Sequence, residues 1–584
     1  MKLSDYVINF FVERNINHSF VISGGAVIHL ADSADKNEKM HIIGTQHEQA
    51  AGAAADMYSR INGNIGLCMT TSGPGATNLV TSVCNAYFDS IPMVCITGQV
   101  SRFRIKPTAN LRQKGFQETD VVSIFKSITK YSKQILNPSD IKYELEKALF
   151  LAKSGRPGPV LLDIPDDLQR EEISPDELRS YEGHIETYDL EKELNHLKSL
   201  LTKSKRPILL LGAGARLANE IDRSIKFAEK LNIPILLTWG AKDILEQDHY
   251  LNMGGVGVCG PRGGNFGIQK SDLIIAIGTR LSQQITGGKQ ELFAPNAKKI
   301  MIDIDQEELD KFDKNSFELD LKINASITDF FDQFNNMDFT LSQNYDSWLS
   351  LINEWVNNYP ICIDKYYSEN NRVNAYVIIN ELSKRCKQGD IILTDAGGNL
   401  SWTMQGFLIK KNQRLISAFN HSPMGGSLPM AIGGAFAAPK KDIICIIGDG
   451  GLMMCLEELA TIRRHSLNIK TLIFNNRGHG IQKQTMDTWL DGRYVLVDEE
   501  SGLYFPDFKL IANAFDIPYL SIDNHKQIEK LDEIFVSTGP LICDVAINDD
   551  QKIEPFLKFG AGLEDLGPKL PEDELAKIMK LETN

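Results

Sequence analysis

Short apolar runs alternate with stretches of helical spacing along most of the chain. Each run is rich in Val, Ile and Leu and ends in turn residues, as is typical of strands buried on both faces of a parallel sheet. The predicted strands cover residues 20–22, 41–45, 65–70, 93–96 and 160–163, then 207–211, 234–237, 273–277 and 299–304, then 391–394, 442–447, 471–474 and 541–546. Helices between successive strands are the connections that parallel strands require. The pattern therefore predicts an α/β protein.

The predicted strands fall into three blocks, which predicts three doubly wound parallel-sheet domains. We expect these domains at residues 1–175, 190–340 and 365–555, followed by a tail at 556–584. The charged, proline-bearing segment 166–191 is predicted to be a linker. The polar segment 335–371 is predicted to form helices between domains. We expect the charged tail either to lie over the active site or to be mobile.

Composition and charge indicate what the chain does not bind. The net charge of −14 over 584 residues argues against a nucleic-acid surface. No apolar run reaches the ~18 residues of a membrane span, and residues 1–15 resemble an amphipathic helix more than a signal peptide. The nine cysteines include no CxxC pair, and several lie within predicted strands, as is typical of a reducing compartment. We therefore expect a cytoplasmic protein that binds neither nucleic acid nor membranes.

A glycine turn that contains an acid follows one of the predicted strands. It reads Gly448-Asp449-Gly450; a helix is predicted over 452–467, and the next strand ends at Asn475-Asn476. Adjacent parallel strands end at the same edge of a sheet, so Asp449 and Asn476 are expected side by side, with glycines that let a phosphate approach the backbone. Hard oxygen ligands at such a turn suit Mg²⁺ bound to a diphosphate. The alternative is an ordinary strand–turn–helix connection with a solvated Asp.

Together these two motifs resemble the thiamine diphosphate (ThDP) enzymes, in which GDG is followed, after a helix, by NN. The resemblance implies a pyrimidine-binding, a central and a diphosphate-binding domain, in that order. It also implies that Asp449, Asn476 and the backbone carbonyl of Gly478 hold Mg²⁺. The residues that it implies for cofactor contacts are Gly397, Asn399, Met424, Gly448, Gly450, Gly451, Asn476, Gly480 and Ile481.

Longer segments are similar to the acetolactate synthase family, and the similarity covers most of the chain. They are HEQAAGAAADMYSR at 47–60, SGPGATN at 72–78, GFQETD at 115–120 and RPGPVLLDIP at 156–165. The similarity implies that Glu48 shares a proton with the aminopyrimidine of ThDP. It further implies that Phe116 and Gln117 border the reacting carbon and that Met424 supports the bent shape of the cofactor.

Each of these four residues also has an ordinary structural explanation. Glu48, at a helix start, can simply interact with the helix dipole. Phe116 can be a packing residue and Gln117 part of a loop. Met424 can fill a core. Only the combination with a ThDP site favours the catalytic interpretation.

Several positions depart from the family pattern where the acceptor substrate is expected. The family's YPGGA is ISGGA at 22–26, and its GMVxQW is GIQKQT at 480–485, which places Thr485 where the family has Trp. Val256 stands where the family often has Met. Two smaller side chains predict a wider acceptor pocket. The residues expected at the acceptor are Gly25, His29, Arg280 and Gln484.

Cofactor positions depart from the family as well. Gly398-Asn399 replaces Gln-His and Gly451 replaces Ser at the diphosphate, but backbone donors can offset both changes, so ThDP and Mg²⁺ remain the expected cofactors. For FAD both outcomes stay open, because strand-end turns at 212–214 and 303–305 favour it whereas Asn324-Ala325 replaces a Gly-Asp contact. Any flavin would be structural, since carboligation needs no redox step.

These features predict decarboxylation of a 2-oxo acid, taken to be pyruvate, with transfer of its acyl unit to an acceptor carbonyl. With pyruvate as acceptor the product is acetolactate. Two alternatives stay open: a larger acceptor, such as a nucleotide-linked keto sugar in surface polysaccharide synthesis, and a simple decarboxylase in which His29 or His479 donates a proton. An inactive binding or regulatory subunit is disfavoured because Glu48, Asp449 and Asn476 are all present. The resemblance implies a homodimer or homotetramer with active sites at the subunit interface.

Overall fold

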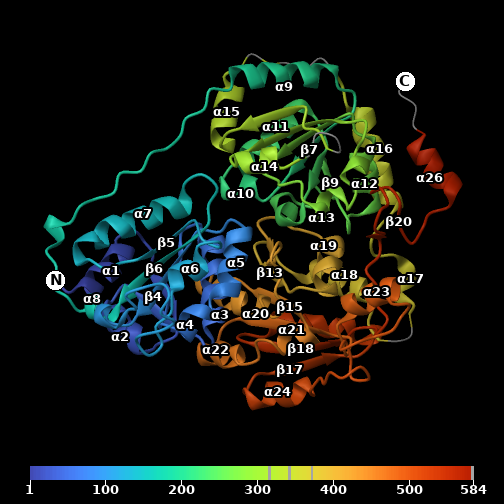
Figure 1. Cartoon of the computed structure of the whole chain (residues 1–584). Helices are drawn as coiled ribbons and strands as arrows, with labels where there is room; N and C mark the ends of the chain where they lie inside the picture. Colours follow the sequence, from blue (N-terminus) through green and yellow to red (C-terminus); the bar gives the residue numbers. More distant parts are fainter. Residues whose placement is uncertain (313–316, 338, 340–342, 370–371, 581–584) are drawn as a thin grey trace.

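The chain forms three α/β domains, each built around a six-stranded parallel sheet (Figure 1). The computed structural model describes residues 1–312, 317–337, 339, 343–369 and 372–580. In Figure 1 the first domain runs from blue to cyan, the central domain from green to yellow-green, and the third from yellow through orange to red. The predicted fold class is confirmed. Within the described ranges, no helix is long and apolar enough to cross a membrane.

The first sheet has the strand order β2-β1-β3-β4-β6-β5. Its strands are β1 (His18–Val21), β2 (His41–Gly44), β3 (Gly66–Thr70), β4 (Met93–Gln99), β5 (Tyr131–Gln134) and β6 (Pro159–Pro165). The helices of this domain are α1 (Leu3–Val12), α2 (Ile28–Lys36), α3 (Glu48–Asn62), α4 (Pro74–Thr77), α5 (Val80–Phe88), α6 (Val121–Phe125), α7 (Ile141–Lys153) and α8 (Asp166–Gln169). Strands β3, β4 and β6 are buried over their whole length, as their continuous apolar runs predict.

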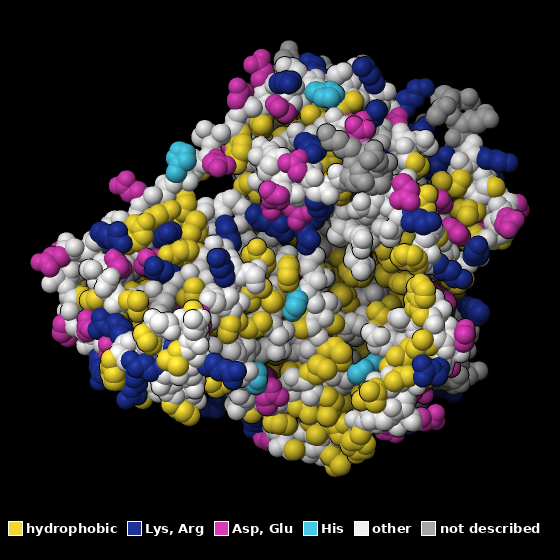
Figure 2. Space-filling model, in the orientation of Figure 1, with side chains coloured by type: hydrophobic (Ala, Val, Ile, Leu, Met, Phe, Trp, Pro, Cys, Tyr) yellow, Lys and Arg dark blue, Asp and Glu magenta, His cyan; other side chains and the backbone are white. Residues whose placement is uncertain are grey.

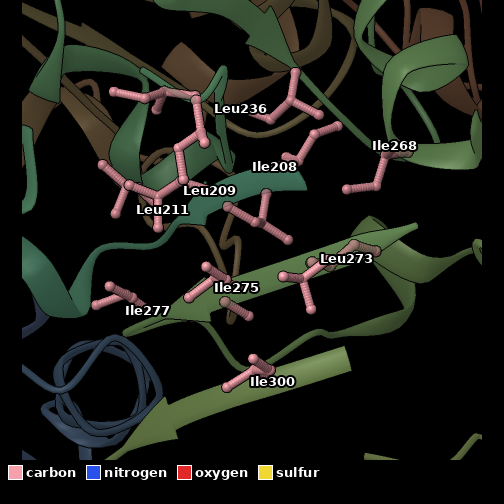
Figure 3. Packing of buried hydrophobic residues seen from close by; sticks show 14 of the residues in the cluster. Ile208, Leu209, Leu211, Leu236, Ile268, Leu273, Ile275, Ile277 and Ile300 are labelled. Carbon is pink, nitrogen blue, oxygen red and sulfur yellow. The ribbon is translucent and has the colours of Figure 1, made fainter. Parts of the chain in front are cut away.

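The central sheet has the order β12-β11-β10-β7-β8-β9. Its strands are β7 (Pro207–Leu211), β8 (Ile235–Leu237), β9 (Asn252–Gly255), β10 (Leu273–Ile277), β11 (Lys298–Asp303) and β12 (Leu321–Asn324). Its helices are α9 (Glu191–Lys203), α10 (Gly214–Leu217), α11 (Ile221–Leu231), α12 (Arg262–Lys270), α13 (Gln283–Thr286), α14 (Gln306–Asp310), α15 (Ile327–Asn335) and α16 (Asp346–Asn358). Ile208, Ile275 and Ile300, one from each of three neighbouring strands, show how branched side chains fill this core (Figure 3).

The third sheet has the order β14-β13-β15-β16-β18-β17. Its strands are β13 (Ile391–Thr394), β14 (Arg414–Ile416), β15 (Ile443–Gly448), β16 (Ile469–Asn475), β17 (Tyr519–Ile522) and β18 (Leu541–Ala546). Its helices are α17 (Asp364–Tyr367), α18 (Ala375–Arg385), α19 (Gly398–Gly406), α20 (Ser427–Ala437), α21 (Asp449–Leu452), α22 (Glu458–Arg464), α23 (Gly480–Trp489), α24 (Phe508–Ala514) and α25 (Leu531–Val536). The single helix predicted over 452–467 is wrong: α21 and α22 are separate, and the buried Cys455 between them continues the apolar spacing across the break.

The first and third sheets have the same topology although their sequences show no repeat. Numbered within its own domain, each has the order 2-1-3-4-6-5, whereas the central sheet has the order 3-2-1-4-5-6 that is typical of dinucleotide-binding domains. In sheets of this kind, ligands bind beyond the carboxyl ends of the strands where the order reverses. In the third sheet this point lies between β13 and β15.

Helices α3 and α20 join the first domain to the third. Their backbones approach so closely that a Cβ atom on Gly433 would lie 2.0 Å from the backbone oxygen of Ala54. The small residues of α3 and Gly433 of α20 are therefore required for this contact. It places the start of α3, which carries Glu48, beside the third domain.

Two connecting segments differ from the sequence prediction. The linker begins later than residue 166, because α8 occupies 166–169, and from 178 to 190 the chain crosses to the central domain without regular structure (Figure 1). In the segment 335–371, α16 joins the central core through Trp348 and Trp355, and α17 packs on α18. Residues 338, 340–342 and 370–371 of that segment lie outside the described ranges.

The described part of the tail packs on the central domain. It forms β19 (Phe556–Leu557), β20 (Leu566–Gly567) and α26 (Glu572–Met579). Leu557, Leu563 and Leu566 join the central core, and the Arg262 guanidinium donates to the carbonyls of Leu566 and Pro568. This part of the tail is anchored, contrary to the expectation of a mobile tail, and its Phe559 ring lies near Trp489 of α23. Residues 581–584 lie outside the described ranges.

Candidate active site

Three turns of the third sheet converge on one pocket. Strands β13, β15 and β16 are parallel neighbours, so the turns that follow them lie at the same edge. A pocket of about 270 Å³ lies there. Its lining residues are Ala396, Gly397, Gly398, Asn399, Trp402, Ser422, Met424, Gly448, Asp449, Gly450, Gly451, Phe474, Asn476, Gly478, His479, Gly480, Ile481 and Gln482. Apart from Glu48, every residue predicted above for contact with ThDP or Mg²⁺ is among them.

Asp449 is a buried carboxylate at the first position of α21. Its Oδ1 atom accepts the N–H of Gly450 at 2.6 Å, and its Oδ2 atom accepts the N–H of Gly478 at 3.0 Å. Burial raises the pKa of Asp449 to about 7. Among the described residues no Lys or Arg forms an ion pair with it. A desolvated carboxylate of this kind is stabilised as an anion by a bound cation, so this site fits Mg²⁺.

The two asparagines after β16 have different surroundings. The Asn475 Nδ2 atom donates to Asp544 at 3.1 Å, away from the pocket. Asn476 is buried and lines the pocket beside Asp449. The described residues contain no group of three or more His, Cys, Asp and Glu side chains that could hold a metal. The predicted site is of another kind, since it combines one carboxylate, one amide and one backbone carbonyl.

Glycines leave the floor of the pocket open to a ligand. Gly397, at φ 107°, adopts a backbone conformation that side chains disfavour, and it precedes α19 at the end of the β13 turn. A Cβ atom on Gly451 would lie 2.4 Å from the Asp395 Oδ2 atom. The Asp395 carboxylate in turn accepts the N–H groups of Gly425 and Ser427. The glycine at 451, where the family has Ser, is therefore explained by the position of Asp395.

Met424 lies in the segment before α20 and not in a helix. It is half-buried and lines the pocket. A Cβ atom on Gly450 would lie 3.3 Å from its Cε atom, so the Met424 side chain extends over the glycine turn. Met424 therefore does not fill a hydrophobic core. From this position its side chain can support a bent ligand from one side.

Sequence reasoning missed several residues that line the pocket. Trp402 lies one turn after Asn399 on α19, and its indole N–H donates to the carbonyl of Lys552. Ser422, two residues before Met424, lines the pocket as well. His479, named above only as a proton donor of the decarboxylase alternative, also lines it, and burial lowers its pKa. The helical spacing from Asn399 would have indicated Trp402. Nothing in the sequence pattern would have indicated Ser422.

The first domain holds Glu48 at a second, separate location. Glu48 is half-buried at the start of α3, and its Oε2 atom accepts the Asn78 amide at 2.8 Å. A Cβ atom on Gly75 would lie 3.5 Å from the other carboxylate oxygen. Two segments similar to the family, 47–60 and 72–78, thus meet at this carboxylate. Within the described chain, Glu48 does not line the pocket of the third domain.

Phe116 and Gln117 lie on a loop that is held by a neighbouring carboxylate. The Glu118 side chain accepts the N–H groups of Lys106, Lys114 and Gly115. Burial opposes ionisation of Glu118, but these backbone donors outweigh it and lower its pKa. Gln117 has φ 61°, and Phe116 is 85% exposed. Such exposure of a large apolar side chain leaves it free for contact with another molecule.

The residues predicted at the acceptor are dispersed in the single chain. Gly25 begins a short turn after β1, and His29 is half-buried on α2, where burial lowers its pKa. The Arg280 Nε atom donates to Glu308 at 2.9 Å. The Gln484 side chain exchanges two hydrogen bonds with the backbone of Ile553. None of these four residues lines the pocket.

The features that favoured FAD have structural explanations of their own. A Cβ atom on Gly212 would lie 2.1 Å from the carbonyl oxygen of Gly278, and Gly214 donates its N–H to the same oxygen. These glycines let two turns at the switch point of the central sheet pack together. Arg156 and Lys311, like Arg280, form ion pairs with Glu308. The glycines of the 212–214 turn are therefore explained by packing alone, and FAD stays a prediction.

Family models match all three domains. The N-terminal TPP (thiamine pyrophosphate, the same molecule as ThDP) binding domain of the thiamine pyrophosphate enzymes matches residues 1–124, the central domain matches 194–333 and the C-terminal TPP binding domain matches 395–545. The third match begins at Asp395 and contains the glycine turn and both asparagines. Each match therefore falls on one of the three sheets.

Full-length relatives are acetolactate synthases. The acetolactate synthase large subunit of Cyanidium caldarium is 33% identical over 569 residues, which cover 95% of this chain and 94% of that protein. The isozyme 2 large subunit of Escherichia coli K12 is 31% identical over 98% of this chain and 100% of that protein. The large subunit of Lactococcus lactis is 30% identical over 95% of this chain and 94% of that protein. This chain therefore belongs to the acetolactate synthase family of thiamine diphosphate enzymes, whose chemistry is decarboxylation coupled to carboligation.

Proposed function

We propose that this enzyme uses ThDP and Mg²⁺ to decarboxylate pyruvate and joins the acyl unit to an acceptor carbonyl. The observation that carries the proposal is the pocket of the third domain, which collects the GDG turn, Asn476 and Met424 in one place. When bound, ThDP supplies the electron sink that lets a 2-oxo acid lose CO₂. The protein supplies the metal site, the orientation of the substrate and the proton transfers.

In the proposed site, the third domain binds the diphosphate end of the cofactor. Asp449, Asn476 and the Gly478 carbonyl hold Mg²⁺. The glycine backbone around Gly397 and Gly451, which lines the pocket without side chains, would accommodate the diphosphate, whereas the Gly480 N–H donates to the Gly478 carbonyl. The Met424 side chain supports the cofactor from the side of the glycine turn.

The first domain, in the proposal, supplies the proton chemistry. Glu48 holds a proton against a ring nitrogen of the aminopyrimidine, as a positioned carboxyl group can. Its hydrogen bond from Asn78 fixes the orientation of the carboxylate. Phe116 and Gln117 exclude water from the reacting carbon and orient the substrate.

We further propose that two chains complete each active site. Glu48 and the pocket lie apart within one chain, and Phe116 is largely exposed. Hydrophobic side chains also gather over the third domain in the space-filling view (Figure 2), and Trp489, Leu496 and Tyr504 of that domain are exposed. Both features support a homodimer or homotetramer in which the first domain of one chain covers the third domain of another.

A larger acceptor, such as a keto sugar on a nucleotide, is a second candidate. Ile481 and Gln482 on α23 line the pocket, and α23 has no buried side chain. Thr485 follows one helical turn after Ile481 and donates its hydroxyl to that residue's carbonyl. Thr485 leaves room that a tryptophan at this position would fill. Loss of the tryptophan contacts would reduce the discrimination against larger acceptors by ~1–3 kcal/mol.

The test is to follow CO₂ release and acetolactate formation together in purified protein supplied with ThDP, Mg²⁺ and pyruvate. Equal rates of pyruvate-derived CO₂ and acetolactate are expected for the main proposal. Slow pyruvate loss that accelerates with keto sugars would favour the larger acceptor. Acetaldehyde as the main product would indicate a simple decarboxylase. No consumption of pyruvate would contradict the proposal and require another 2-oxo acid donor.

A further inference from the structure

A buried carboxylate of the third domain holds the backbone that leads into α3. Glu458 is the first residue of α22, and its side chain is fully buried. Its Oε1 atom accepts the N–H of Gln46 at 2.9 Å and the N–H of His47 at 3.0 Å. Glu458 is 412 positions away from Gln46 in the sequence. The contact therefore joins two domains and not two neighbouring turns.

The second oxygen of Glu458 is fixed as well. Its Oε2 atom accepts the hydroxyl of Thr461 at 2.7 Å. Burial raises the pKa of Glu458, whereas these three hydrogen bonds oppose the rise. The side chain thus has one defined orientation, with one oxygen directed at the first domain and the other at its own helix.

The two N–H groups that Glu458 accepts belong to the residues immediately before Glu48. N–H groups at a helix start have no partner within the helix and need an acceptor from elsewhere. The His47 Nδ1 atom accepts the N–H of Gln49, and Ser82 donates its hydroxyl to the Gln49 carbonyl. Of the side chains that bond to the start of α3, Glu458 is the one that comes from another domain. Together with the α3–α20 contact, it fixes the start of α3 against the third domain.

Glu458 also belongs to the segment that carries the diphosphate turn. Asp449 begins α21, and α22 follows after a turn at 453–457. α22 packs beside α20, which in turn packs on α3. Asp449, which lines the pocket, and Glu458, which holds the start of α3, are thus nine positions apart on one continuous segment.

We propose that Glu458 is a positioning residue that holds Glu48 in its working orientation and links it to the diphosphate turn of the same chain. This inference rests on the role proposed above for Glu48. In the proposed dimer, the Glu48 and the pocket of one chain serve different active sites. Glu458 is then a physical connection between the two sites, through which a shift of the GDG turn reaches the other site's carboxyl group.

Three variants test the inference. Glu458→Ala removes the acceptor. Glu458→Gln keeps an amide oxygen that can accept the same two N–H groups. Glu457→Ala is the matched control, because Glu457 is the adjacent residue, has the same chemistry and is exposed. Thermal unfolding of each variant establishes that it is folded, and the isosteric Gln variant keeps the test decisive if the Ala variant is not.

The first readout is amide hydrogen exchange at Gln46 and His47 in protein without added cofactor. Loss of both acceptor bonds in Glu458→Ala should accelerate exchange by at least about 10-fold, whereas Glu458→Gln and Glu457→Ala should match the wild type. The second is turnover with saturating ThDP and Mg²⁺. Because a displacement of about 1 Å can lower a rate about 100-fold, Glu458→Ala should lose at least ~10-fold in kcat with KM for pyruvate little changed.

The outcomes separate this inference from the function on which it rests. Unchanged amide hydrogen exchange at Gln46 and His47 in Glu458→Ala would contradict the proposal that Glu458 holds the start of α3. Faster amide exchange with unchanged kcat in Glu458→Ala would show that these hydrogen bonds do not position Glu48. An equal loss in Glu458→Gln and Glu458→Ala would mean that the charge matters and not the position. Normal turnover in Glu48→Gln would contradict the proposed proton-transfer role of Glu48, whatever the amide exchange data show.

Discussion

The two asparagines after β16 show how adjacent residues of one type can have separate roles. Asn476 lines the pocket beside Asp449, whereas the Asn475 side chain bonds to Asp544. Asn476→Ala should weaken Mg²⁺-dependent ThDP binding at least about 10-fold, because it removes one of the proposed oxygen ligands. Asn475→Ala is the control, and it should leave cofactor affinity close to that of the wild type. Titration of ThDP at fixed Mg²⁺, followed by protein fluorescence, measures both, and equal effects would contradict the assignment.

A second prediction at this scale concerns pH and stability. Asp163 on β6 is fully buried and accepts hydrogen bonds from Thr97, Gln99 and Gln134. Burial raises the pKa of Asp163 from 3.8 to about 6. A carboxyl group whose pKa is raised in the folded state adds to stability at low pH, and this contribution is lost as the pH rises through about 6.

The stability difference between the wild type and Asp163→Asn should therefore change with pH. The wild type should lose about 2–3 kcal/mol relative to the variant between pH 4 and pH 7. Thermal unfolding of both proteins across this range tests the direction. A difference that stays constant, or that grows in favour of the wild type as the pH rises, would contradict it.

At the scale of elements, the contact between α3 and α20 depends on a single glycine. A Cβ atom on Gly433 would lie 2.0 Å from the Ala54 backbone oxygen, whereas one on Gly434 would lie 3.4 Å from the end of the Met57 side chain. Gly433→Ala should therefore destabilise the protein by about 1–3 kcal/mol. Gly434→Ala should be neutral or stabilising by up to about 1 kcal/mol, because Ala favours a helix. Denaturant unfolding of the pair tests this, and equal effects would contradict the packing argument.

The elements differ in how well the sequence predicted them. Strands such as β3, β10 and β15 are long apolar runs, and their pattern identified them. The strands β5, β9, β14 and β17 at sheet edges were missed, because their runs are short, polar or rich in glycine. The break between α21 and α22 was missed because apolar spacing continues through it.

The pocket was predictable because its residues share a local signature. A turn after a buried strand, with glycines and a hard oxygen ligand, can be recognised from neighbouring positions in the sequence. Glu458 and Asp395 could not be found in this way, since their partners are far away in the chain or contribute only backbone atoms. The packing of the tail was missed for the same reason, because it depends on contacts with α12.

At the scale of the whole molecule, the two proposed halves of the active site do not meet within one described chain. The pocket around Asp449 lies in the third domain, and Glu48 lies at the start of α3 in the first. The proposed assembly pairs each half with the complementary half of another chain. In that arrangement, a defect in Glu48 and a defect in Asp449 on different chains leave one site without any defect.

The most direct test is therefore to co-express Glu48→Gln with Asp449→Ala and to isolate the mixed oligomers through two different tags. Each variant alone should release almost no CO₂ from pyruvate. The isolated mixed dimers should have roughly half of the wild-type activity, since each pairs unlike chains and one of its two sites is intact. Mixed oligomers as inactive as their parents would contradict the shared site, and activity in Glu48→Gln alone would contradict its role.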